Sequence, residues 1–139
     1  ATDIRYENYF DIIVFKSIIG GIGRNNNIQM QEKVFTEIYK SLKPGGKLLF
    51  AENLIASPLH QFLRKKFIRW GRDWRYIALN ELSRFLSPFK SYKNEVTGIL
   101  AALGRTEWQR NMLAYIDQLI LNHICPDNWK YIVYGIAEK

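Results

Sequence analysis

Two apolar runs separated by an amphipathic segment dominate the hydrophobic pattern of the chain. Residues 10–17 and 47–53 are rich in β-branched and aromatic side chains without regular polar alternation, which is typical of strands covered on both faces of a parallel sheet. Over residues 29–42 apolar side chains recur every fourth position, and Pro44-Gly45-Gly46 follows, so we expect an amphipathic helix that stops there. The order strand, helix, strand predicts a right-handed parallel βαβ unit.

The middle of the chain predicts two helices and a further strand. Ser57-Pro58 places a capping hydroxyl before a proline at the first helical position, which indicates a helix start. The helix that follows has one apolar and one basic face. We expect a short helix around residues 80–86 and a strand over residues 89–97, with Tyr92 and Val96 facing inward.

The last third of the chain predicts a long helix and a closing strand. Thr106-Glu107-Trp108-Gln109 has the spacing of a capping box, so we expect a helix from there to about residue 123. Residues 129–137 predict the closing strand. The apolar residues of the helix are expected to face the core: Trp108, Met112, Tyr115, Ile116, Leu119 and Ile120.

Composition narrows the class of protein. A length of 139 residues with 47% hydrophobic and 24% charged residues fits one globular domain, with a helical cap at about residues 57–87. The single cysteine, Cys125, excludes an intrachain disulfide, and no secretory signal pattern opens the sequence, so we expect a cytoplasmic location. No apolar run reaches the roughly 18 residues needed to span a bilayer. The net charge of +7 favours anionic partners.

Three stretches together resemble class I S-adenosylmethionine-dependent methyltransferases, specifically the small-molecule group with a type 11 methyltransferase domain. Residues 2–14 are similar to that family's acidic loop and fourth strand, residues 42–49 to the turn into its fifth strand, and residues 129–137 to its closing strand. The resemblance implies a partial Rossmann-like α/β sheet, with parallel strands, an antiparallel carboxy-terminal strand and helices on both faces. It covers only the second half of the family's domain, without the Gly-rich loop and the ribose-binding acid.

The resemblance implies S-adenosylmethionine as the cofactor, and it places Ala1 and Thr2 at the adenine edge of the site in an intact protein. Lys16, Ser17 and Ile18 end the first predicted strand, where open α/β sheets bind their ligands, so they are further cofactor-binding candidates. A lysine at an apolar strand end is costly to bury, so Lys16 should face a cleft or a carboxylate.

A second glycine-rich run does not fit the cofactor loop. Gly20-Gly21-Ile22-Gly23 follows the first predicted strand and lacks the full Gly-x-Gly-x-x-Gly spacing. We therefore interpret it as a flexible connection.

Glu52 and His60 are the candidate catalytic bases for an acceptor hydroxyl, because a carboxylate or an imidazole needs only reach and a suitable pKa. The alternative for Glu52 is a solvated strand end or a salt bridge, and His60 is expected to be exposed. Methyl transfer needs few catalytic side chains, because in-line positioning of the sulfonium donor can lower the activation barrier greatly. No group of residues predicts a metal site.

The substrate-binding candidates lie at the end of the second predicted strand and in the basic segment beyond it. Six positive charges fall between residues 64 and 75, interleaved with aromatic residues. They either grip an anionic acceptor as a lid or form a solvated helix face with snorkelling stems. The candidates are Asn53, Arg64, Arg69, Trp70 and Trp74.

The predicted function is S-adenosylmethionine-dependent methyl transfer to a small-molecule or lipid- or sugar-linked acceptor, with this chain inactive by itself. Two alternatives stay open. The net charge favours a nucleic-acid (RNA) methyltransferase, but Lys16-Ser17-Ile18-Ile19 stands where an Asn-Pro-Pro-Tyr-type motif would be expected. The other alternative is a non-catalytic α/β fragment.

Overall fold

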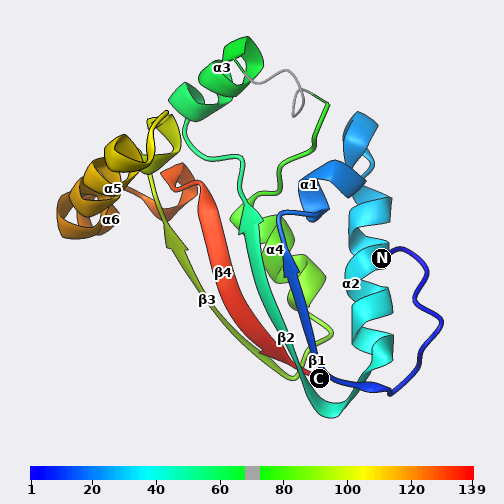
Figure 1. Ribbon diagram of the computed structural model, residues 1–139. Helices are drawn as coiled ribbons and strands as arrows, with labels where there is room; N and C mark the ends of the chain where they lie inside the picture. The colour runs from blue at the N-terminus through cyan, green and yellow to red at the C-terminus, as the bar shows by residue number, and fades with distance from the viewer. Residues whose placement is uncertain (68–72) are drawn as a thin grey trace.

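The computed structural model describes residues 1–67 and 73–139, and its first half is the predicted βαβ unit. β1 (Phe10–Lys16) is followed by the short helix α1 (Ile19–Ile22) and by α2 (Ile28–Ser41), which returns the chain to β2 (Leu42–Asn53). β1 and β2 pair in parallel, so α2 is the crossover between them (Figure 1). The prediction of two parallel neighbouring strands is confirmed.

The second half of the chain completes a mixed sheet. The sheet order is β1-β2-β4-β3, and β4 runs antiparallel to both of its neighbours, which confirms the expected antiparallel carboxy-terminal strand. No helix among the described residues is long and apolar enough to cross a bilayer. The remaining elements are α3 (Pro58–Phe67), α4 (Leu79–Leu86), β3 (Ser91–Thr97), α5 (Glu107–Ile116), α6 (Asn122–Ile124) and β4 (Ile132–Glu138).

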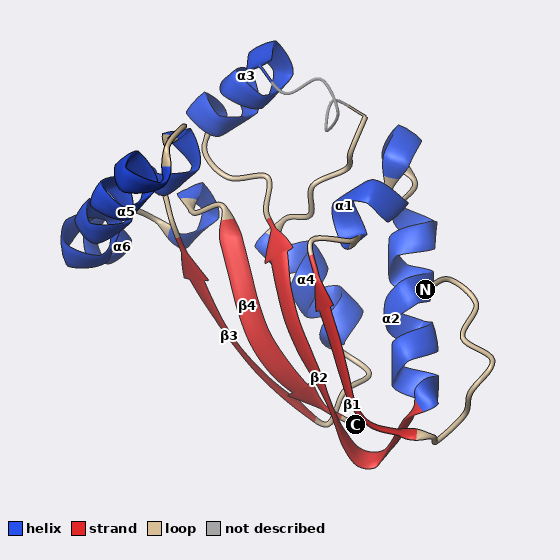
Figure 2. Ribbon diagram, viewed as in Figure 1, coloured by secondary structure: helices blue, strands red, loops and turns tan. Residues whose placement is uncertain are grey.

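Among the described residues, α2 and α4 cover one face of the sheet (Figure 2). Side chains alternate along each strand, so Leu48 and Phe50 are buried towards these helices, whereas Ile12 and Val14 on the opposite face are 59% and 69% exposed. The two apolar runs supply apolar side chains to both faces, but residues 1–67 and 73–139 provide a helical layer for only one.

β2 begins at Leu42 rather than at residue 47. Residues 42–46 continue into the sheet directly after α2: Gly45 N–H donates to Lys139 O and Lys139 N–H donates to Gly46 O, each at 3.0 Å, and Gly45 has a positive φ of 77°. The pairing register between β1 and β2 shifts between Phe10 and Ile12. The Pro-Gly-Gly turn therefore also joins the base of the sheet to the chain's last residue.

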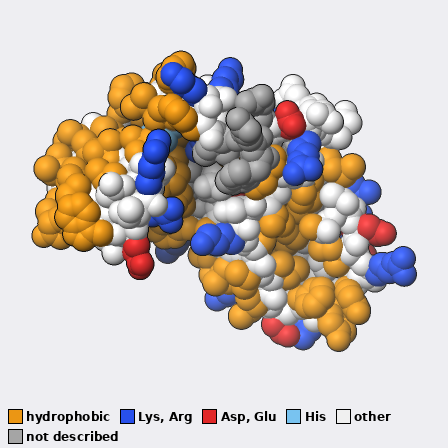
Figure 3. Space-filling view, turned by 45° about the horizontal axis from the view of Figure 1, so that its top comes forward, with side chains coloured by type: hydrophobic (Ala, Val, Ile, Leu, Met, Phe, Trp, Pro, Cys, Tyr) orange, Lys and Arg blue, Asp and Glu red, His pale blue; other side chains and the backbone are white. Residues whose placement is uncertain are grey.

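The long helix near the carboxy terminus begins as predicted but faces the other way. α5 and α6 are joined by a π-helical turn (Asp117–Leu121), and the capping box between Thr106 and Gln109 is present. The prediction that its apolar stripe faces the core is wrong, since Trp108 is 71% exposed. Figure 3 shows hydrophobic side chains gathered over α5 and α6.

Asp117 explains the orientation of that helix. Its carboxylate is 2% exposed and accepts hydrogen bonds from the backbone N–H groups of Ile99, Leu100 and Ala101 at 2.8–3.0 Å. A buried carboxylate is tolerated when it is hydrogen-bonded in this way. The face of the helix that carries Asp117 is thereby fixed inward, and the apolar stripe lies on the other side.

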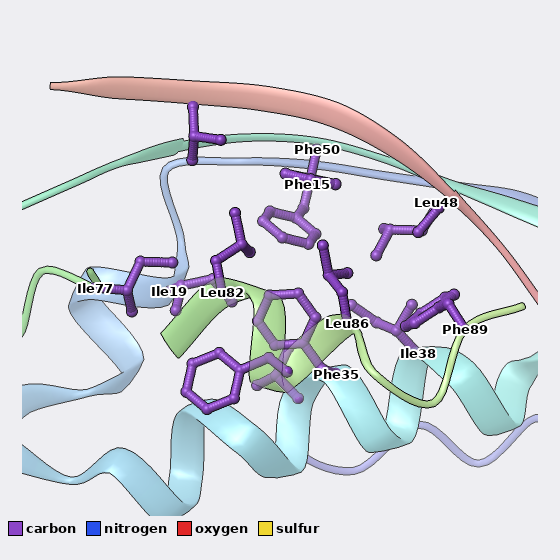
Figure 4. Packing of buried hydrophobic residues seen from close by; sticks show 14 of the residues in the cluster. Phe15, Ile19, Phe35, Ile38, Leu48, Phe50, Ile77, Leu82, Leu86 and Phe89 are labelled. Carbon is purple, nitrogen blue, oxygen red and sulfur yellow. The ribbon is translucent and has the colours of Figure 1, made fainter. Parts of the chain in front are cut away.

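The hydrophobic core lies between the sheet and the layer of α2 and α4 (Figure 4). Phe35 of α2 is 2% exposed, and its ring lies 5.8 Å from that of Phe15 on β1 and 5.3 Å from that of Phe85 on α4. Aromatic pairs at these separations stabilise a core beyond their buried area alone. Phe35 therefore joins three elements of the fold at one point.

Replacing Phe35 with alanine should lower the free energy of unfolding by about 3–5 kcal/mol, because it leaves a cavity among three elements. The same replacement at Phe62, which is 59% exposed, should change it by less than about 0.5 kcal/mol. Chemical denaturation followed by circular dichroism measures both. Equal losses for the two variants would contradict the core described for Phe35.

Candidate functional site

The carboxyl ends of β1 and β2 meet at one edge of the sheet, and side chains from β2 hold the loop that follows β1. Ser17 adopts a positive φ of 53°, which is uncommon for a residue with a side chain. Its N–H donates to Ala51 O at 2.9 Å, and its Oγ accepts from Asn53 Nδ2 at 3.1 Å. Asn53, a substrate-binding candidate, is therefore hydrogen-bonded to Ser17, a cofactor-binding candidate.

Glu52 is buried at the same edge but on the core side of the sheet, 2% exposed. One carboxylate oxygen accepts from Ile19 N–H at 2.8 Å, and the other accepts from Asn53 N–H at 2.8 Å. Burial raises the pKa of the Glu52 carboxyl above its ordinary value, although these backbone hydrogen bonds oppose the shift. The alternative of a solvated or salt-bridged Glu52 is wrong: its partners are the backbone N–H groups of Ile19, at the start of α1, and of Asn53, the last residue of β2.

The glycine run after β1 is a helical turn and not a flexible connection, which corrects that interpretation. Gly20 and Gly21 lie in α1, and Trp74 packs on them so closely that a Cβ on Gly20 would lie 3.3 Å from the indole ring. A Cβ on Gly23 would meet the side chain of Gln31 at 2.2 Å. These glycines allow close packing of α1 against α2 and the segment around Trp74.

A buried polar network behind α1 was not anticipated from the sequence. Gln31 of α2 is fully buried, and its Nε2 donates to Ile19 O at 3.0 Å and to Arg75 O at 2.8 Å. The Arg75 guanidinium donates in turn to Gln31 Oε1 at 2.7 Å and forms an ion pair with Glu81 of α4. The network joins the loop after β1 to two helices and to the segment that carries Trp74.

His60 is 3% exposed, so the expectation that it is exposed is wrong. Its Nε2 lies 2.6 Å from Ile99 O and its Nδ1 lies 2.7 Å from Ser57 Oγ. A carbonyl oxygen only accepts, so Nε2 carries the proton and Nδ1 accepts from the Ser57 hydroxyl. Burial lowers the pKa of the His60 imidazole, which favours this neutral form, and the ring stacks on Tyr131 with centroids 5.7 Å apart.

The guanidinium group of Arg64 makes contacts with other residues of this chain. Its Nη1 donates to Leu54 O at 2.7 Å and to Ile55 O at 3.0 Å, and its guanidinium lies 4.0 Å from the centre of the Tyr76 ring. The neighbouring Lys65 and Lys66 are exposed by comparison. Arg69 and Trp70, the other two candidates in the basic segment, lie outside the described residues.

The remaining cofactor candidates are Lys16, the last residue of β1, Ile18, the residue before α1, and Ala1 and Thr2 at the start of the chain. Lys16 lines a shallow groove of about 950 Å³ on the open face of the sheet, together with Val14, Leu49 and Tyr134. The start of the chain runs along α2, where Ile4 N–H donates to Glu37 at 3.2 Å, and Ala1 and Thr2 precede that contact. Within residues 1–67 and 73–139 no three His, Cys, Asp or Glu side chains form a group able to hold a metal ion.

Comparisons with known proteins show which solved structures have a similar fold. No protein-family model and no curated protein sequence matches the chain. Phosphoethanolamine N-methyltransferase 2 from Haemonchus contortus, solved with phosphomonomethylethanolamine and S-adenosylhomocysteine, is 17% identical with a TM-score of 0.59, over 99% of this chain and 35% of that one. A methyltransferase from Thermotoga maritima, described as a possible histamine N-methyltransferase, is 15% identical with a TM-score of 0.62, over 99% and 60% of the two chains.

The solved cyclase SpnF is also similar, 16% identical with a TM-score of 0.53, over 99% of this chain and 53% of its own. The chain thus spans about a third to three fifths of the length of these three structures. At such low identity the likeness concerns the fold and not the activity. The chain has the fold of part of a class I S-adenosylmethionine-dependent methyltransferase: a mixed sheet with β1 and β2 parallel and β4 antiparallel.

Proposed function

We propose that this chain is the carboxy-terminal half of an S-adenosylmethionine-dependent methyltransferase domain whose acceptor is a small molecule or a lipid- or sugar-linked group. The observation that carries the proposal is the incomplete side of the sheet. Among residues 1–67 and 73–139, β1 is an edge strand that pairs only with β2, and Ile12 and Val14 on its open face are largely exposed. A free edge beside an uncovered apolar face favours further polypeptide at this position, and the similar solved chains are longer than this one.

In this proposal the carboxyl edge of β1 and β2 forms one wall of the cofactor site. Lys16, Ser17 and Ile18 line it, and Ala1 and Thr2 add contacts at the adenine edge. The bound cofactor would supply an activated methyl group on a sulfonium. The contribution of this chain is to hold the loop after β1 in a fixed conformation, because positioning accounts for much of the catalysis of such a transfer.

The acceptor side of the proposed site is the segment that leaves β2. Arg64 fixes α3 to the end of β2 through the Leu54 and Ile55 carbonyls, so it acts as a positioning residue here. Gripping an anionic acceptor then falls to Lys65 and Lys66, which are exposed. Arg69 and Trp70, which lie outside the described residues, stay candidates from the sequence, and Trp74 packs on Gly20 and Gly21 of α1.

Titration of the 139-residue chain with S-adenosylmethionine should show no specific binding in the micromolar range, because the strands and the Gly-rich loop that would carry most of the contacts lie outside it. Isothermal calorimetry measures this directly. Circular dichroism of the same sample shows whether the chain is folded. Saturable micromolar binding by a folded sample would show that the cofactor site is complete within these residues.

Methyl transfer is tested with the whole protein that contains this chain, incubated with methyl-labelled S-adenosylmethionine and separated small-molecule, lipid and RNA fractions. The proposal expects label in the small-molecule or lipid fraction. Label confined to RNA would support the nucleic-acid alternative. Cofactor binding with no transfer to any fraction would contradict the proposed activity.

The role of Glu52 as a general base stays a prediction, and its burial suggests a second role. The carboxylate already accepts hydrogen bonds from Ile19 and Asn53, so it holds the loop after β1 whether or not an acceptor reaches it. His60 likewise uses both ring nitrogens within the protein. Both residues are therefore proposed as positioning residues first, and as bases only if the acceptor displaces one of these contacts.

Glu52→Gln should change how stability depends on pH. The folded pKa of Glu52 is raised above the ordinary value of 4.5. The contribution of this carboxyl to the free energy of unfolding of the wild type is therefore complete below pH 4.5 and is lost as pH rises through the folded pKa. Glutamine does not titrate. The free energy of unfolding of wild type minus that of the variant should be largest at low pH and should shrink as pH rises.

Urea denaturation at a series of pH values measures this difference. Glu32→Gln, the same change at an exposed carboxylate on α2, controls for the loss of one negative charge. A difference between wild type and Glu52→Gln that grows with pH would contradict the raised pKa and the buried position of this carboxyl.

A further inference from the structure

The helix formed by α5 and α6 has an apolar stripe without a partner among the described residues. Its side chains follow helical spacing and are 44–71% exposed, although the buried Asp117 fixes the opposite side of the helix to the protein. Exposed apolar stripes of this size mark interaction surfaces. The stripe comprises Trp108, Met112, Tyr115, Leu119, Ile120 and Ile124.

α3 carries a second exposed apolar stripe, and basic side chains lie beside it. Leu59 and Phe62 are 54% and 59% exposed, and Lys66 lies 5.8 Å from the centre of the Phe62 ring. α3 contains no acidic residue. The helix therefore combines exposed apolar side chains with positive charges and has no acidic residue of its own.

The two stripes belong to one end of the molecule. His60 of α3 donates a hydrogen bond to Ile99 O. Ile99 belongs to the turn whose backbone N–H groups donate to Asp117. The first turn of α3 is thereby joined to the base of the α5–α6 helix. Figure 3 shows this end, with hydrophobic side chains over α5 and α6 and Lys and Arg side chains towards α3.

This end lies away from the incomplete side of the sheet. α5 and α6 connect β3 to β4, and β3 is the edge strand opposite β1 in the order β1-β2-β4-β3. A polypeptide that paired with β1 would therefore add to the far edge of the sheet. Such a strand would lie beside β1 and not beside the α5–α6 stripe.

We propose that the α3 and α5–α6 stripes form one docking surface for a lipid bilayer that contains anionic phospholipid. Interfacial helices place Trp, Phe and Leu into the boundary between headgroups and acyl chains, with Lys and Arg near the headgroups. Here Lys65, Lys66, Arg105 and Arg110 flank the stripes, and Glu107 is the exposed acid among residues 58–67 and 105–124. Charge complementarity thus favours an anionic membrane, whereas a second copy would bring like charges together.

Flotation of the full chain with lipid vesicles tests the proposal, because it separates vesicle-bound protein from aggregates. Vesicles of phosphatidylcholine with phosphatidylserine should float the chain, with weaker binding at high salt, and pure phosphatidylcholine vesicles should float it less. The joint change Trp108→Gln, Tyr115→Gln and Leu119→Gln should weaken binding by more than about tenfold. Lys65→Gln with Lys66→Gln should weaken it by about 10- to 30-fold.

Matched control variants remove exposed aromatic side chains or positive charges that lie outside the two stripes. Tyr6→Gln with Tyr9→Gln alters two exposed aromatic residues before β1, and Lys33→Gln with Lys47→Gln removes two exposed charges on α2 and β2. Both controls should bind vesicles like wild type. Binding that falls equally in the controls and in the stripe variants would overturn the proposal, as would absence of flotation with anionic vesicles.

A conservative variant covers the case in which the glutamine variant fails to fold. Brominated lipid should quench tryptophan fluorescence of the wild type, and Trp108→Phe should keep vesicle binding but lose most of that quenching. Unchanged quenching in Trp108→Phe would show that this side chain does not enter the bilayer. Sedimentation velocity that shows a dimer lost in the stripe variant would assign the surface to a second copy and overturn the membrane proposal.

Discussion

β2 pairs with β1 in the parallel direction and with β4 in the antiparallel direction, and the arrangement of the sheet depends on this double pairing. The parallel pairing requires the crossover through α2, which brings the carboxyl ends of β1 and β2 to one edge of the sheet. The antiparallel pairing returns the last strand into the sheet interior. Residues of β2 on the helical face, from Leu48 to Glu52, consequently extend from the core to the proposed site.

Two buried carboxylates fix the loops at that edge. Glu52 accepts a hydrogen bond from Ile19 N–H at the start of α1, and Asp117 accepts hydrogen bonds from three backbone N–H groups in the turn before α5. Burying a carboxylate is costly unless hydrogen bonds replace water, so each loop is held in the conformation that supplies them. The loop after β1, which the proposed function places at the cofactor site, is therefore ordered by the fold itself.

The sequence predicts the βαβ unit because its runs and helical spacing are long and locally consistent, and it predicts the Thr106 capping box from spacing alone. The prediction that the apolar side of α5 faces the core was wrong because an apolar stripe shows that a helix is amphipathic. It does not show whether that side packs on the core or lies at the surface. Burial of Glu52 and His60 was missed because charged and polar side chains are usually exposed. A signal for Glu52 did exist: strand alternation places it on the same face as the buried Leu48 and Phe50.

The exposed apolar surfaces at the two ends of the sheet differ in what can cover them. Within the part of the chain that the structure describes, the outer edge of β1 is unpaired, so its backbone N–H and C=O groups need hydrogen-bonding partners. Hydrocarbon offers none, and open sheet edges are therefore not accommodated in lipid, which leaves water or another polypeptide strand beside β1. The helix α5–α6 satisfies most of its backbone internally, and its apolar stripe can enter a bilayer without that cost. Backbone hydrogen bonding thus separates a surface that fits the rest of a protein domain from one that fits a membrane.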